Sequence, residues 1–143
     1  MAHVEEFFVP LPESVSAHRV LDVLLVEDDE ADTFLMTRAL RSIPRIGRIV
    51  HARDGVEALE ALDVRAFDPD VAIIDLHMPR KSGFSLLVEL GCRDDQMHTL
   101  VMTSSKSSWD AARSKLRGAG QFFTKPDTLD EFNKVLSAAI ADL

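Results

Sequence analysis

Five short apolar runs, each followed by a stretch with helical spacing, constrain the fold of this chain more than any other feature. Each run is short enough for a buried strand, and the runs lie at residues 20–26, 48–51, 71–74, 100–103 and 121–123. Apolar residues recur three or four positions apart in the intervening stretches 32–42, 55–62, 84–90, 109–116 and 129–141. The alternation predicts a strand–helix unit that is repeated five times.

Such alternation in a short chain predicts an α/β protein with a doubly wound, five-stranded parallel sheet. Crossovers between parallel strands are right-handed, and each helix must bury its apolar stripe, so helices cover both faces of the sheet. For the strand order 2-1-3-4-5, a ligand site is expected beyond the carboxyl ends of the first and third strands, where the winding reverses. Functional residues are therefore expected at that edge of the sheet.

Acidic side chains stand at both of these strand ends. Glu27 and Asp28 follow the first run, and Asp75 follows the third. Each set alone is explained by a solvated acidic turn or a polar strand end. Together, carboxylates about 4 Å apart repel by roughly 4 kcal/mol at an effective dielectric near 20, so they should recruit a cation. Oxygen ligands favour Mg²⁺.

The remaining strand ends add a hydroxyl and an amine. The fourth run ends at Thr103, and Lys125 follows the fifth. Each is ordinary turn chemistry alone, but with the acids they form a set suited to phosphoryl transfer onto Asp75.

These residues resemble those of the receiver domains of two-component response regulators, over residues 20–141. The resemblance is carried by V-E-D at 26–28, D-x-x-M-P at 75–79 with Gly83, M-T-S at 102–104 and K-P at 125–126. It implies a flavodoxin-like (βα)5 receiver fold. The stretch V-E-D-D-E-A-D, with T-S-S after the fourth strand, looks most like single-domain regulators paired with phytochrome-type histidine kinases.

The resemblance implies a role for each site residue. Asp75 would accept a phosphoryl group from a phosphohistidine of a sensor histidine kinase. Asp28 would ligate Mg²⁺ directly, Glu27 would hold it through water, and His77 would offer its backbone carbonyl. Thr103 and Lys125 would contact the phosphoryl oxygens, so this would be a phosphoacceptor rather than an enzyme acting on outside substrates.

Output is expected at a protein-interaction face. In the family, a hydroxyl residue and an aromatic residue act as the switch, which here correspond to Thr103 and Phe122; Phe122 lacks the hydroxyl of the commoner tyrosine. No output domain is expected after Leu143, so the signal would pass to a downstream protein target. We also expect a homodimer, because the apolar residues of the last helix slightly exceed one buried stripe: Phe132, Val135, Leu136, Ala139, Ile140 and Leu143.

Composition narrows the partners and the compartment. A net charge of −8 disfavours nucleic acid, and no stretch is long and apolar enough to span a membrane. The single Cys92 has no disulfide partner, and the N-terminus does not resemble a signal peptide, so a cytoplasmic protein is expected. Residues 1–18, with two prolines and scattered charges, are read as an extension before a domain at 19–143. This extension either folds back on its own domain or docks on a partner subunit.

Three other functions remain open at this stage. A receiver-like adaptor would act without phosphorylation. An FMN-binding flavodoxin-like protein would need a first loop rich in Ser, Thr and Gly rather than Glu27 and Asp28. A phosphohydrolase with an aspartyl nucleophile would usually carry a second acid where this chain has His77.

Overall fold

The computed structural model describes residues 4–8, 19–64, 67–78, 82–91, 97–104 and 120–143, together with residues 93, 113 and 115. In residues 4–8, Glu6 is the side chain that it describes. The strands are β1 (Val4–Phe8), β2 (Leu21–Val26), β3 (Ile46–Ala52), β4 (Val71–Asp75), β5 (His98–Thr103) and β6 (Gln121–Thr124). The helices are α1 (Glu30–Arg41), α2 (Gly55–Asp63), α3 (Gly83–Gly91) and α5 (Leu129–Ala141).

The parallel part of the sheet confirms the predicted topology. The strand order is β1-β3-β2-β4-β5-β6, in which β3, β2, β4, β5 and β6 run parallel. In chain order of the parallel strands, this is 2-1-3-4-5. The carboxyl ends of β2 and β4 therefore lie side by side at the point where the winding reverses.

Strand β1 is an addition that the periodicity of the sequence did not reveal. It pairs antiparallel with β3 from Val4↔Ala52 to Phe8↔Arg48, at the edge of the sheet. Arg48 donates from Nε and a terminal nitrogen to both carboxylate oxygens of Glu6, at 2.6 and 3.0 Å. This part of the extension thus folds back on its own domain. Residues 9–18 lie outside the described residues.

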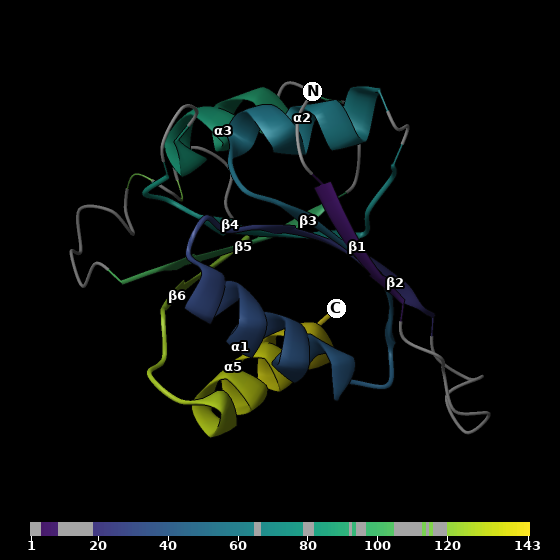
Figure 1. Ribbon diagram of the computed structural model, residues 1–143, viewed down its shortest axis with the longest axis vertical. Coiled ribbons are helices and arrows are strands. Elements are labelled where there is room, and N and C mark those ends of the chain that lie inside the picture. The colour runs from purple at the N-terminus through teal and green to yellow at the C-terminus, as the bar shows by residue number, and fades with distance from the viewer. Residues whose placement is uncertain are drawn as a thin grey trace.

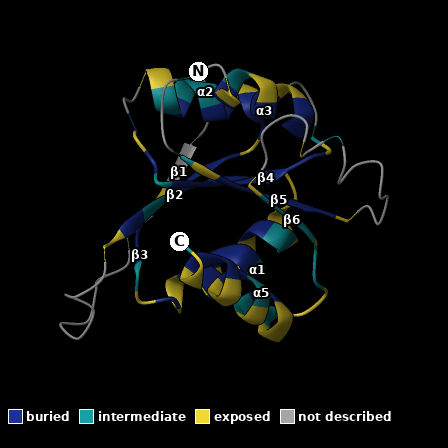
Figure 2. Cartoon of the chain, turned by 180° about the vertical axis from the view of Figure 1, so that it is seen from behind, coloured by how far each residue is buried: buried dark blue, intermediate teal, exposed yellow. Residues whose placement is uncertain are grey.

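The sheet is buried between two helical layers (Figure 1). Helices α1 and α5 lie below it, and α2 and α3 lie above it. Alternate residues of β2 show why both faces need cover: Leu21, Val23 and Leu25 belong to one apolar cluster, and Leu24 and Val26 belong to the other. In Figure 2 the central strands β2, β3, β4 and β5 are mostly buried, whereas the exposed residues of the helices face outward.

Side chains that cap the first turn mark the starts of three helices. Asp54 accepts a hydrogen bond from the amide of Glu57 at 2.9 Å, and Thr128 accepts one from Glu131 at 3.2 Å. Asp29 caps α1 in the same way. The predicted fourth helix, at 109–116, lies outside the described residues, apart from residues 113 and 115, which are helical.

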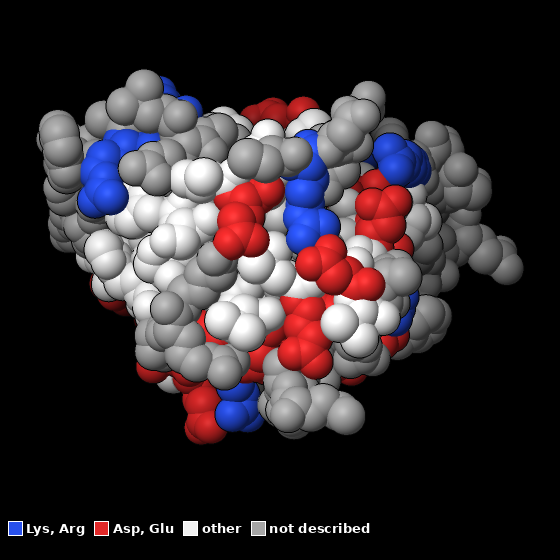
Figure 3. Space-filling view, turned by 90° about the horizontal axis from the view of Figure 1, so that it is seen from above, with Lys and Arg blue, Asp and Glu red and all other residues white. Residues whose placement is uncertain are grey.

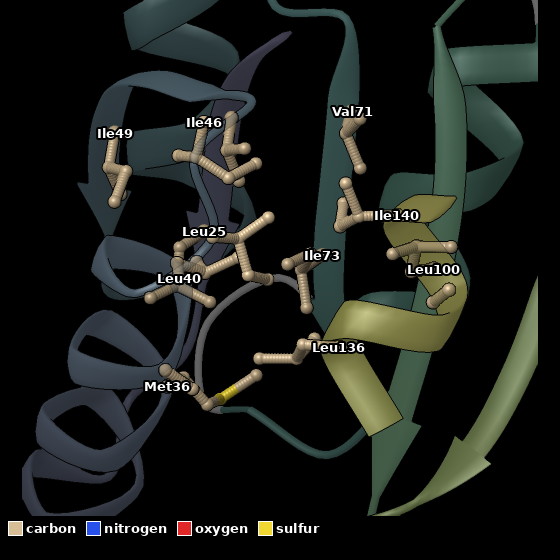
Figure 4. Close-up of a cluster of buried hydrophobic side chains, with 14 of the residues drawn as sticks. Leu25, Met36, Leu40, Ile46, Ile49, Val71, Ile73, Leu100, Leu136 and Ile140 are labelled. Atoms are coloured by element: carbon tan, nitrogen blue, oxygen red, sulfur yellow. The ribbon is translucent and has the colours of Figure 1, made fainter. Parts of the chain in front are cut away.

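Helix α5 uses its apolar stripe inside the domain. Phe132 and Leu136 are fully buried in the cluster beneath the sheet, alongside Ile140 and residues of α1 such as Met36 (Figure 4). Val135 and Leu143 are partly buried against the same cluster. The residues that suggested a homodimer are therefore accounted for by the core, and the homodimer stays a prediction.

Two further features concern a membrane and nucleic acid as partners. Among the described helices, none has both the length and the apolar character needed to cross a bilayer. Figure 3 views the molecule from the side of α2 and α3. There, acidic and basic side chains of the described residues are interspersed without a continuous basic patch.

Candidate functional site

Three predicted acids meet at the carboxyl edge of the sheet. Val26 is in register with Ile74, so Glu27 leaves β2 beside Asp75, the last residue of β4. One ligand oxygen from each of Glu27, Asp28 and Asp75 lies within 4.8 Å of the others. Glu27 is fully buried, Asp75 is 7% exposed, and Asp28 is exposed at the mouth. The fold thus gathers carboxylates that are 48 residues apart.

Lys125 supplies the positive charge of this pocket. Its Nζ donates to Glu27, to Asp32 at 3.0 Å and to Asp75 Oδ2 at 3.4 Å. Its position is fixed by the neighbouring strand β5, because the Lys125 amide donates to the carbonyl of Thr103 at 2.7 Å. Asp32, in the first turn of α1, is a site residue that the sequence analysis missed. The available signal was its place in the first helical turn after the acidic strand end, close to Glu27 and Asp28 in the sequence.

Burial and crowding set the protonation of the site. Desolvation, followed by contact with Asp75, raises the pKa of Glu27 from 4.5 to about 9, against the opposing attraction of Lys125. Partial burial and Asp75 also raise the pKa of Asp28. Burial alone would lower the pKa of Lys125, but its contacts with Glu27 and Asp75 raise it, so this amine is a cation at neutral pH. The acids outnumber the cation that neutralises them.

The donor set fits a hard divalent cation. Glu27 Oε2 is buried and finds no hydrogen-bond partner among the described residues, although a buried carboxylate oxygen normally has one. Carboxylate oxygens at this spacing are the ligands that Mg²⁺ and similar ions take up. The backbone carbonyl of Glu27 is held separately, 2.7 Å from Nε2 of the buried His51. The loop that carries the acids is therefore anchored from β3.

The loop after β4 is shaped by two close backbone approaches. The His77 amide donates to Asp75 Oδ1 at 3.2 Å, while the His77 ring is exposed and lies edge-on to Phe84, with centroids 6.2 Å apart. The Gly83 amide donates to the Leu76 carbonyl at 3.0 Å. A Cβ at Gly83 would lie 2.2 Å from the Asp75 carbonyl oxygen, so only glycine allows α3 to start there.

The two predicted switch residues lie on β5 and β6. Thr103 is fully buried at the end of β5, one residue beyond Met102, the register partner of Asp75. Phe122 is half-buried and packs against the apolar cluster that faces α2 and α3. Its neighbour Phe123 packs on the opposite cluster, as expected of alternate strand residues.

The fold and this pocket define a doubly wound α/β protein with an acidic cation site at its switch point. The family model of the response regulator receiver domain matches residues 23–137. The chain belongs to this family. The match confirms the resemblance, and it gives the FMN-binding alternative no support.

The proteins that are similar to this chain in sequence include regulators from bacteria and archaea. The Regulator of RpoS from Escherichia coli K12 is 35% identical over 104 residues, which cover 73% of this chain and 30% of that protein. The probable methanogenesis regulatory protein FilR2 of Methanothrix harundinacea is 27% identical over 121 residues, which cover 80% of this chain and 77% of that protein. The chain thus matches less than a third of the E. coli protein.

Two solved structures of phytochrome-associated and related regulators are similar. The phosphorylated cyanobacterial phytochrome response regulator RcpA has a TM-score of 0.76 and 26% identity, covering 84% of this chain and 91% of that one. The Mn²⁺-bound response regulator Rcp1 has a TM-score of 0.74 and 25% identity, covering 85% and 92%.

Proposed function

We propose that this protein is a phosphoacceptor of a two-component system, phosphorylated on Asp75 by a sensor histidine kinase in an Mg²⁺-dependent reaction. The observation that carries the proposal is the convergence of Glu27, Asp28 and Asp75 around one pocket, with the Lys125 amine inside it. An adaptor that never takes phosphate would have no need to bury this costly set of charges.

In the phosphoryl transfer, the main contribution of the protein is to position the reacting groups. A carboxylate oxygen of Asp75 attacks the phosphorus of the donor phosphohistidine, the P–N bond breaks as the P–O bond forms, and the imidazole leaves as it takes up a proton. Asp75 Oδ1 already accepts from the His77 amide, and Oδ2 faces Lys125. We assign the attack to Oδ2, because Lys125 lies there and can meet the incoming phosphoryl oxygens; Thr103 is proposed to contact them as well.

Glu27, Asp28, Asp75 and the backbone carbonyl of His77 would hold the cation. When bound, Mg²⁺ supplies positive charge that offsets repulsion between the phosphoryl oxygens and these acids. The proposed specificity for Mg²⁺ rests on the all-oxygen donor set, and the Mn²⁺-bound Rcp1 supports a divalent ion at such a site.

The proposed partners follow from the comparisons. A phytochrome-type kinase is supported by the similarity to RcpA, and the proposed cytoplasmic location is supported by the single Cys92, which has no disulfide partner in the chain. The output would be a conformational change at the Thr103 and Phe122 switch, read by a downstream protein target. Turnover would be confined to the protein's own phosphotransfer and dephosphorylation.

Incubation with acetyl phosphate and Mg²⁺, read by intact mass, tests the proposal. The wild type should gain one phosphoryl group, and EDTA should abolish the gain. Asp75→Asn should gain none, whereas the matched control Asp130→Asn, which alters an exposed carboxylate of α5, should behave as the wild type. Equal labelling of Asp75→Asn and the wild type would move the acceptor to another residue, and an unlabelled wild type would favour the adaptor.

A further inference from the structure

A second cavity, of about 420 Å³, lies between α1 and the end of β3. It shares Asp28 with the acidic pocket, but the rest of its lining is different. Its volume is in the range of small-molecule sites in proteins. Nothing in the proposed phosphotransfer uses its other residues.

The floor of this cavity is polar and buried. Thr33, Thr37 and His51 are between 5 and 8% exposed. Thr33 Oγ1 donates to the Asp29 carbonyl at 2.8 Å, and the Nε2 atom of His51 faces the Glu27 carbonyl. Thr37 Oγ1 has no hydrogen-bond partner in the part of the chain that the structure describes, although it is buried. A buried hydroxyl with neither a partner nor a ligand is destabilising, which suggests that it serves a bound group.

The rim of the cavity carries three exposed arginines at its two ends. Arg38 and Arg41 lie in the last turn of α1, whereas Arg53 follows β3 beside Asp28, because Ala52 is in register with Val26. The Arg38 guanidinium lies 5.6 Å from the centroid of Phe34, whose ring is 59% exposed. Arginine forks match the oxygens of phosphate groups, so the pair in the last turn of α1 suits a phosphate.

The opposite end of the cavity is acidic apart from Arg53. Glu30 begins α1, and Asp28 precedes it, while Arg41 ends the helix. At a rise of about 1.5 Å per residue, Glu30 and Arg41 are separated by roughly 16 Å along the helix. An occupant would therefore carry its negative charge at one end and hydrogen-bond donors at the other.

We propose that this cavity binds a small organic phosphate. The phosphate head pairs with Arg38 and Arg41, at the end of the cavity away from the acids, and accepts the hydroxyl hydrogen of Thr37. The uncharged body lies against Phe34, and its hydroxyl or amine donors point toward Asp28 and Glu30. The site does not require phosphorylation of Asp75, so it can be tested separately from the proposed function.

Amide-resolved NMR titration tests the site, with inorganic phosphate and ribose 5-phosphate as probes. The titrations are made in EDTA, so that no divalent ion draws phosphate to the acidic pocket, and are repeated in Asp75→Asn. Millimolar ribose 5-phosphate should shift the amides of Thr33, Thr37 and His51 in both proteins. It should bind ~10-fold more tightly than inorganic phosphate, because its hydroxyl-bearing body adds contacts.

Matched variants separate binding from folding. Thr37→Val removes the hydroxyl at constant charge, and we expect it to fold at least as stably as the wild type, yet to bind ~10-fold more weakly. Arg38→Gln should weaken binding at least as much, whereas Lys134→Gln makes the same charge change on an exposed face of α5 and should have no effect. Shifts confined to Asp75 and its neighbours would overturn the proposal. So would equal binding by Lys134→Gln, Arg38→Gln and Thr37→Val.

Discussion

Replacing Lys125 by Met tests whether this amine holds the buried acids together. At an effective dielectric near 20, its charge attracts Asp32 at 3.0 Å and Asp75 at 3.4 Å by about 5 kcal/mol each before desolvation. The side chain of Lys125 is only 9% exposed, so much of this attraction offsets the cost of burying the amine. Removing one partner from a buried pair typically costs ~3–5 kcal/mol.

We expect the lower end of that range, about 3 kcal/mol, in the free energy of unfolding at pH 7 in EDTA. The reason is Glu27: with a pKa of about 9 it can keep its proton, which removes one charge from the repulsion that the variant leaves behind. Urea unfolding followed by circular dichroism gives the value. The control Lys134→Met, on the exposed side of α5, should change it by less than ~0.5 kcal/mol.

A double-mutant cycle with Asp75→Asn isolates the pair. Because the acids repel when Lys125 is absent, Asp75→Asn should stabilise the Lys125→Met protein by at least ~1 kcal/mol more than it stabilises the wild type. Equal losses in Lys125→Met and Lys134→Met, or a cycle that closes with no coupling energy, would refute the view that Lys125 neutralises this pocket.

Three further outcomes are expected. The pKa of Glu27 is raised from 4.5 to about 9, so its contribution to stability is full below pH 4.5 and is lost as pH rises through 9. Thermal melts in EDTA should show stability falling over that window, Mg²⁺ affinity measured by calorimetry should rise over it, and Glu27→Gln should flatten both. Gly83→Ala should destabilise by more than ~2 kcal/mol in urea unfolding, because its Cβ would meet the Asp75 carbonyl at 2.2 Å, whereas Gly91→Ala, at the exposed end of α3, should not. Glu6→Gln removes the charge that Arg48 pairs with, and hydrogen exchange should then be faster in the amides of β1 while those of β2 are unchanged.

The parallel sheet was predictable because strands that are buried on both faces are apolar at successive positions of the sequence. Val71–Ile74 is apolar at every position, since alternate residues face the two helical layers. Strand β1 shows no such apolar run. It lies at the edge of the sheet, where neither face has to be buried along its whole length. Its sequence V-E-E-F-F mixes charged and apolar residues without alternation. What stabilises it is a contact 42 residues away, between Glu6 and Arg48, which no local pattern reports.

The acids of the site were predictable for a different reason. Parallel strands end at a common edge, so any residue that follows β2 or β4 is placed there by topology, and the residue types at Glu27, Asp28 and Asp75 then identify the chemistry. Lys125 follows β6 by the same logic. Asp32 does not follow a strand: it reaches the pocket through the direction in which α1 leaves the sheet, which Asp29 fixes by capping the helix.

The Lys125 amine is shared among three acids, and this arrangement cannot be read from the residues at the strand ends alone. Its amine contacts Glu27, Asp32 and Asp75 at once, and an ammonium has three hydrogens to donate. On the proposed function, an incoming phosphoryl oxygen must take the place of one of these partners. Asp32 is the most exposed of the three, so it loses least by turning to solvent. Asp32, which the sequence analysis missed, is therefore the acid that holds Lys125 before phosphorylation and can release it when the phosphoryl group arrives.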